Sequence, residues 1–188
     1  SEVASSQEFQ DAKKSIISSS KRAIKNTINK TKPIIETVKM RGNIHKHDRQ
    51  FRKVRRASAD GYRFAIGDDA VKILEYEGTD STLKIPNAVQ RRPITFINPG
   101  FLTGSAAARV QKIRLPKYLE YLSDNTFLGC EQLAYIIIPP NIKYVCKKAF
   151  RGCNPSIIYF LGECPGGMKN VYVPRRTKLL CTGRYADS

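Results

Sequence analysis

The sequence predicts a β-rich solenoid of short repeats that follows a basic, α-helical N-terminal arm. Two observations support this fold class. Within residues 110–156 one 23-residue pattern occurs twice, with its apolar, Pro, Gly and Cys positions kept. In residues 1–60, 15 basic and 6 acidic residues accompany apolar residues at helical spacing. A fixed period of about 20 to 29 residues with this apolar spacing is typical of leucine-rich repeats.

The two copies correspond residue by residue when 23 is added to the residue number. Each copy is expected to form a short strand that ends at a Pro, which has no N–H for a further ladder bond. Gly129 should permit a tight bend. We expect Cys130 and Cys153 to be small buried residues in the core rather than a disulfide or a metal site. One copy cannot bury its own apolar edge, so the copies must stack. The matched pairs are Ile113 and Ile136, Leu115 and Ile138, Pro116 and Pro139, Leu119 and Ile142, Tyr121 and Tyr144, Leu122 and Val145, Phe127 and Phe150, Gly129 and Gly152, and Cys130 and Cys153.

The pattern Ile-x-Leu-Pro-x-x-Leu-x-x-Leu-x-x-x-x-Phe-x-Gly-Cys-x-x-Leu at residues 113–133 closely resembles the BspA-like leucine-rich repeat. The resemblance extends over residues 70–180. It includes a divergent opening repeat upstream and a closing strand at Val171-Tyr172-Val173-Pro174. It implies a repeat solenoid that serves as a binding scaffold in many settings, surface adhesins among them.

Four parts of the chain are predicted. They are a basic amphipathic helical arm (1–40), a polybasic linker (41–60), a leucine-rich-repeat domain (61–182) and a tail (183–188). The repeat domain should open with a β-hairpin that caps the exposed first edge of the solenoid. Its strands are expected at Tyr62–Ile66 and Val71–Tyr76, on either side of a Gly-Asp-Asp turn. Residues 87–109 are interpreted as a degenerate repeat with insertions at Gln90–Pro93 and Ser105–Arg109, and a third, truncated repeat begins at Ile157.

Residues 6–31 are predicted to form a basic amphipathic helix, because apolar residues recur at spacings of three, four and seven. Ser5-Ser6-Gln7-Glu8 has the pattern of a capping box at its start. Either the helix packs its apolar stripe on the solenoid or on a second copy of itself, or it anchors the chain to a partner or an anionic surface. The stripe consists of Phe9, Ile16, Ile17, Ala23, Ile24 and Ile28.

The formal net charge of +17 favours acidic partners, which are nucleic acid, anionic lipid or an acidic protein surface. The expected linker is the densest basic segment, and such segments contact phosphate through charge without reading sequence. His45 and His47 lie there without other ligands nearby, so we expect solvated side chains rather than a metal site. The candidate residues for binding an anionic partner are Lys46, Arg49, Arg52, Lys53, Arg55 and Arg56.

The sequence offers no catalytic constellation, no phosphate-binding Gly loop and no metal-spaced Cys/His cluster. Asp68-Asp69 is interpreted as a turn. We therefore expect no enzymatic activity, no cofactor, no metal and no small-molecule substrate. The five Cys include no Cys-x-x-Cys pair, which we interpret as a reducing setting without disulfides.

Strand positions between the buried ones are expected to form the concave face of the solenoid. Five of these seven residues are large and apolar or aromatic, whereas solvent-facing strand positions are usually polar. A contiguous stripe of this kind is typical of an interface. Either a partner covers it, or the N-terminal helix lies across it, or the strand alternation is misplaced. The seven residues are Lys112, Arg114, Tyr135, Ile137, Ile158, Phe160 and Tyr172.

We predict a non-enzymatic protein–protein interaction and structural module in a large assembly, such as a virion or a ribonucleoprotein. The repeat face would dock it and the basic arm would anchor it. Two alternatives stay open: a cell-surface, adhesin-type ligand-binding protein, which the resemblance implies, and a nucleic-acid-binding accessory protein, which the charge implies. The sequence shows no secretory signal pattern and no apolar run of about 18 residues. We therefore expect no transmembrane segment and favour an intracellular or virion setting over secretion.

Overall fold

The computed structural model describes residues 18–19, 21–23, 25–27, 38–39, 42–46, 48–165 and 167–182. The chain divides into two compact units, Ser1–Asn43 and Ile44–Ser188. The residues described between positions 18 and 39 are helical. Most of the helix predicted for residues 6–31 and all of the tail 183–188 lie outside the described residues. The second unit carries the repeats.

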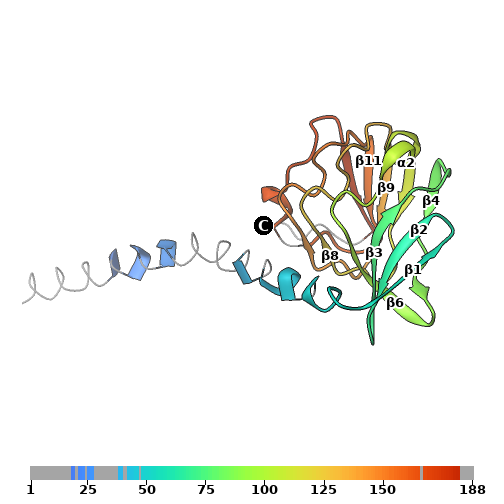
Figure 1. The fold of residues 1–188 in the computed structure, drawn as a ribbon. Helices are drawn as coiled ribbons and strands as arrows, with labels where there is room; N and C mark the ends of the chain where they lie inside the picture. Colours follow the sequence, from blue (N-terminus) through green and yellow to red (C-terminus); the bar gives the residue numbers. More distant parts are fainter. Residues whose placement is uncertain are drawn as a thin grey trace, which may run out of the picture. The chain divides into compact units, whose positions relative to one another are not determined.

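In the second unit the strands are arranged as a solenoid (Figure 1). One five-stranded sheet, the cap sheet, has the order β1-β2-β3-β6-β5, and a second, the repeat sheet, has the order β12-β11-β9-β7-β4. From β3 to β11 the chain alternates between the repeat sheet and the other strands, which include the pair β8 and β10. The strands are β1 Arg55–Ala59, β2 Tyr62–Ile66, β3 Val71–Tyr76, β4 Thr82–Lys84, β5 Ala88–Val89, β6 Arg92–Ile97, β7 Lys112–Arg114, β8 Tyr121–Leu122, β9 Tyr135–Ile138, β10 Tyr144–Val145, β11 Ile157–Phe160 and β12 Lys178–Cys181.

All neighbouring strands of the repeat sheet are parallel. The chain makes one turn of the solenoid between each strand of this sheet and the next. Parallel pairing is expected when similar repeats stack in this way. The fold predicted from the repeat pattern, a short β-rich solenoid, is confirmed.

The cap sheet begins with the predicted hairpin, because β2 pairs antiparallel with β3. The hairpin has an additional strand, β1, which pairs antiparallel with β2. The turn between β1 and β2 consists of Asp60 and Gly61, whose φ angles are 51° and 78°. Two successive residues at positive φ form the tight turn that suits the twist of a two-residue hairpin. Strand β1 thus occupies the end of the segment expected to be a linker.

Three described residues of that expected linker, Ile44, Phe51 and Val54, pack on the cap sheet. Phe51 is 3% exposed and forms a small second core with Ala65 and Phe96. Asp48 forms an ion pair with the buried ammonium group of Lys72, which also lies 5.0 Å from the centre of the Phe96 ring. Residues 44–59, which the sequence analysis assigned to a polybasic linker, therefore lie in the same compact unit as the repeats.

The main core lies between the repeat sheet and the strands opposite it. The apolar positions predicted from the two copies are buried, and the rings of Phe127 and Phe150 stack 5.9 Å apart with planes 4° apart. Cys130 and Cys153 are free and buried, as predicted for small core residues. Burial raises the pKa of each thiol to about 12. Both thiols are therefore protonated at neutral pH and are poor nucleophiles.

Residues 87–109 contain more regular structure than the expected degenerate repeat. Strands β5 and β6 pair antiparallel across a turn in which Gln90 and Arg91 have positive φ angles of 50° and 64°. The short helix α2, Gly104–Arg109, follows before β7. Both predicted insertions thus have regular local structure, and α2 packs Ala106 into the main core.

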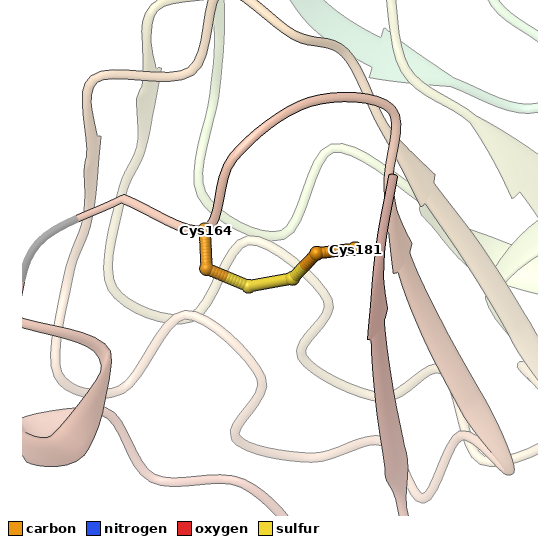
Figure 2. The surroundings of a disulfide bond; sticks show 2 residues. All are labelled: Cys164 and Cys181. Carbon is orange, nitrogen blue, oxygen red and sulfur yellow. A yellow bond between two sulfur atoms is a disulfide. The ribbon is translucent and has the colours of Figure 1, made fainter. Parts of the chain in front are cut away.

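The closing strand was placed wrongly. The last strand of the repeat sheet is β12, which pairs parallel with β11, whereas residues 171–173 lie outside the sheet. The expectation of an entirely disulfide-free chain was also wrong, because Cys164 and Cys181 form a disulfide with Cα atoms 6.2 Å apart. Figure 2 shows this bond joining the loop after β11 to β12. It ties the final strand to the preceding repeat.

Candidate protein-interaction face

The repeat sheet has one face in the core and one face toward solvent, because successive side chains of a strand point to opposite sides. The inward positions include Ile113, Ile136 and Ile158, which are 0% exposed. We call the solvent side the open face. It consists of Thr82, Lys84, Lys112, Arg114, Tyr135, Ile137, Ile157, Tyr159, Lys178 and Leu180.

The strand register arranges the open face in two rows. One row crosses the sheet as Thr82, Lys112, Tyr135, Ile157 and Lys178. The other crosses it as Lys84, Arg114, Ile137, Tyr159 and Leu180. The side of the face over β4 and β7 is therefore basic, and the side over β9, β11 and β12 is mainly apolar and aromatic.

Four of the seven residues predicted for the concave face lie on the open face. They are Lys112, Arg114, Tyr135 and Ile137. Tyr135 is 46% exposed. These four come from the two complete copies of the repeat, for which the strand alternation was correctly assigned.

The positions assigned to Ile158 and Phe160 were wrong, because both side chains are buried in the core with 0% exposure. Lys112 pairs with Tyr135, which is 23 residues later, but Tyr135 pairs with Ile157, which is only 22 residues later. One residue is missing between the Gly-Cys pair and the strand of the third copy. A shift of one residue exchanges the two faces of a strand.

Tyr172 was also placed wrongly. It is 53% exposed but lies outside the repeat sheet, and its backbone N–H donates a hydrogen bond of 2.7 Å to the carbonyl of Lys147, just beyond β10. The sequence reasoning missed six residues of the open face, which are Thr82, Lys84, Ile157, Tyr159, Lys178 and Leu180. A shortened spacing in the sequence could have identified Ile157 and Tyr159. The buried Pro155 takes the place of Leu133 in the next copy, but it lies two residues after Cys153, whereas Leu133 lies three residues after Cys130.

Two shallow hollows lie on and beside the open face. The first, of about 230 Å³, is lined by Lys112, Tyr135, Ile136, Ile137, Ile157, Tyr159 and Leu180. The second, of about 340 Å³, lies at the carboxyl ends of the strands and is lined by Lys84, Ile85, Asn87, Arg114, Leu115, Lys117, Pro139, Pro140 and Leu161. Neither lining contains an acidic residue. We call them the apolar hollow and the basic hollow.

The cations of the open face carry uncompensated charge. Lys84, Lys112, Arg114 and Lys178 are exposed, and within the described part of the chain none of them forms an ion pair. Exposed cations without partners attract acidic groups at short range. This side of the open face can therefore accept carboxylates or phosphates.

The six candidate residues of the basic segment are all exposed. Lys46 and Arg49 are in helical conformation, Arg52 and Lys53 lie in the following turn, and the last two belong to β1. None of the six takes part in an ion pair among the residues that the structure describes. They are Lys46, Arg49, Arg52, Lys53, Arg55 and Arg56. Because Phe51 is buried beneath this segment, it offers no ring for base stacking.

The part of the chain that the structure describes contains no group of three or more His, Cys, Asp or Glu side chains that could hold a metal ion. No helix among the same residues is long and apolar enough to span a membrane.

Stacked repeats with one open sheet face define this unit as a leucine-rich-repeat solenoid, a class that binds other proteins through extended sheet surfaces. Residues 105–165 match the family described as "BspA type Leucine rich repeat region (6 copies)". Residues 105–165 therefore carry BspA-type leucine-rich repeats, as the sequence pattern predicted.

No curated protein matches the chain. Among solved structures it is similar to a leucine-rich-repeat protein of T. pallidum, with 13% identity, a TM-score of 0.30 and coverage of 69% of this chain and 86% of that one. It is also similar to a leucine-rich cell surface protein of Faecalibacterium prausnitzii A2-165, with 13% identity, a TM-score of 0.25 and coverage of 68% and 51%.

Proposed function

We propose that the protein is a non-enzymatic interaction module that docks onto a protein neighbour through its open face, as a structural component of a larger assembly. One observation carries the proposal. Tyr135, Ile137, Ile157, Tyr159 and Leu180 form a contiguous apolar group on a solvent-facing sheet. Tyr135 and Leu180 are 46% and 43% exposed, and burying such a group against a partner is favourable.

The basic segment supplies a second contact in this proposal. Its six exposed cations lie on a segment that packs Ile44, Phe51 and Val54 on the cap sheet, so the backbone that carries the charges is held in place before a partner arrives. A polyanion such as the nucleic acid of a virion or a ribonucleoprotein is the proposed partner of this segment.

The mass of the native particle that carries the chain tests the docking surface. We expect the wild-type chain to purify within a particle much larger than its own 21.2 kDa. Tyr135→Ser combined with Tyr159→Ser should release it. Tyr172→Ser is the matched control, because this Tyr is exposed but lies off the repeat sheet. A wild-type chain that is monomeric in its native extract would contradict the assembly proposal.

Salt dependence tests the polyanion contact separately. The logarithm of the binding constant for single-stranded RNA should fall steeply with the logarithm of salt concentration. Replacing Arg52, Lys53 and Arg55 by Gln should reduce that slope by roughly two, at about 0.7 per lost phosphate contact. Replacing Tyr135 and Tyr159 by Ser should leave the slope unchanged. If the three Gln substitutions leave the salt slope unchanged, the nucleic-acid part of the proposal is wrong.

A second candidate function is a cell-surface, adhesin-type ligand-binding protein. The disulfide between Cys164 and Cys181 favours it, because disulfides persist mainly in oxidising compartments. Alkylation of the protein in its native host before lysis distinguishes the two. A surface protein should show both of these cysteines protected from the reagent until it is reduced, and it should be accessible to proteases added outside the cell.

A further inference from the structure

The open face changes its chemistry along a single row of paired residues. Lys84 on β4 pairs with Arg114 on β7, and Arg114 pairs with Ile137 on β9. The row continues through Tyr159 to Leu180. Two neighbouring cations are thus followed, across the strands, by three apolar or aromatic side chains. A ligand that crosses the strands meets the two chemistries in this order.

The two hollows lie at the two parts of this row. The apolar hollow lies over β9, β11 and β12, with aliphatic and aromatic side chains on its floor. The basic hollow lies at the carboxyl ends of β4, β7, β9 and β11, and its cations, Lys84, Arg114 and Lys117, lie at or just after the ends of β4 and β7. A chain that fills both hollows must carry an apolar anchor and a separate acidic group.

We propose that the open face binds an extended peptide segment of a partner protein, with an apolar side chain over β9 to β12 and carboxylates over β4 and β7. This inference rests on the proposed function and specifies the chemistry of its partner. Arg and Lys at the basic hollow would pair with the carboxylates, and Arg114 suits a bidentate contact.

Strand spacing sets the distance between the two parts of the ligand. Neighbouring strands lie about 4.8 Å apart. The centre of the apolar hollow over β11 is therefore roughly 10 to 14 Å from β7 and β4, which are two and three strands away. An extended chain advances about 3.3 Å per residue. The carboxylates should follow or precede the apolar anchor by about three to four residues.

The apolar hollow favours a peptide over nucleic acid. Sequence-tolerant binding of single strands requires aromatic faces on which successive bases stack. The floor has two Tyr rings, Tyr135 and Tyr159, among the aliphatic residues Ile137, Ile157 and Leu180, and its aliphatic part suits an apolar side chain better than a base. The cations are solvent-exposed, so each contributes modestly to affinity and mainly selects the partner and its placement.

A peptide library displayed on phage, selected on the immobilised full chain, tests the inference. Enriched sequences should share an aromatic or aliphatic anchor residue and a pair of acidic residues. The acidic pair should lie three to four residues from the anchor. A synthetic peptide of the most enriched sequence should bind the Lys84→Glu, Arg114→Glu double variant at least tenfold more weakly than wild type. Lys147→Glu is the control, because this Lys is exposed beyond β10 and away from the open face. Raising salt from 0.1 to 0.5 M should weaken wild-type binding, since exposed charges are screened.

Other results overturn the inference in distinguishable ways. In one such result, the enriched peptides lack acidic residues, or they bind the charge-reversal variant as tightly as wild type. If their binding is nevertheless abolished by Tyr135→Ser and Tyr159→Ser, the inference is wrong and the proposed function stands. If the library yields no binder, or only binders that ignore both sets of substitutions, both are wrong. If a 20-nucleotide single-stranded DNA competes with the peptide and shows the same dependence on Arg114 and Tyr135, the face binds nucleic acid and the inference is wrong.

Discussion

A β-carbon added to Gly152 would lie 3.0 Å from the backbone nitrogen of Gly129, its equivalent one repeat earlier. Both residues have positive φ angles, 85° and 80°, which a side chain disfavours. The two bends therefore stack so closely that the later one leaves no room for a side chain. Close stacking of the two repeats therefore requires glycine at the later bend.

Substitution of these glycines should separate backbone strain from steric contact. Gly129→Ala should lower the free energy of unfolding by about 1 to 2 kcal/mol, the cost of the left-handed conformation, because nothing lies within 4 Å of its added β-carbon. Gly152→Ala should cost more, since it adds the contact with Gly129. Urea unfolding of both variants measures the difference. Equal losses would show that the repeats are packed less closely here.

The register of β11 predicts opposite effects for two adjacent aromatic residues. Phe160 is 0% exposed, so Phe160→Ser should lower the free energy of unfolding by at least about 3 kcal/mol. Tyr159 faces the open side and is half-buried, so Tyr159→Ser should cost less than about 1.5 kcal/mol. Thermal and urea unfolding provide the measurement. A larger loss for Tyr159→Ser than for Phe160→Ser would place Phe160 on the surface. It would then support the exposed position of Phe160 that was predicted from the sequence.

Two tyrosines of the cap sheet differ in the pairing of their hydroxyl groups. The Tyr62 hydroxyl is buried with no hydrogen-bond partner among the described residues, whereas the Tyr76 hydroxyl donates to the Oδ2 atom of Asp80 at 2.7 Å. Tyr62→Phe should therefore leave stability unchanged or raise it by about 1 kcal/mol. Tyr76→Phe should lower it by roughly 1 to 3 kcal/mol. A loss for Tyr62→Phe as large as for Tyr76→Phe would contradict this assignment.

The buried thiols predict a loss of stability at alkaline pH. Burial raises the pKa of Cys130 and Cys153 from 9.0 to about 12 in the folded protein. Between these values the unfolded chain releases thiol protons that the folded chain keeps, so stability is complete below pH 9 and falls as the pH rises toward 12. The urea midpoint should drop between pH 8 and pH 10, and Cys153→Ala should reduce that drop. An unchanged drop in the variant would assign the effect to other groups, such as Tyr62, whose pKa burial also raises.

The central repeats could be predicted from sequence because the two copies keep the same types of residue at equivalent positions, so an assignment made in one copy can be compared with the other. Ile113 and Ile136, and likewise Phe127 and Phe150, keep the same environment at a constant spacing, and all four are buried. The same pattern correctly predicted which face of β7 and β9 is exposed. The hairpin of β2 and β3 could be predicted from its turn and the two apolar runs beside it.

The remaining features lack such an internal check. The third copy is one residue shorter before its strand, and a single deletion moved Ile158 and Phe160 to the wrong face. Strand β1 is mostly exposed and basic, so it shows no alternation of apolar and polar residues. The disulfide joins Cys164 to Cys181 in a segment outside the repeat pattern, and spacing alone does not identify which cysteines meet.

The most direct test of the account is hydroxyl-radical footprinting of the chain, free and within its native particle. We predict that Tyr135 and Tyr159 become protected in the particle, because the partner covers the open face. Tyr172, which is 53% exposed and lies off the repeat sheet, should keep its reactivity and serve as the internal control. Equal reactivity of Tyr135 and Tyr159 in both samples would contradict the claim that this protein binds its neighbour through the open face.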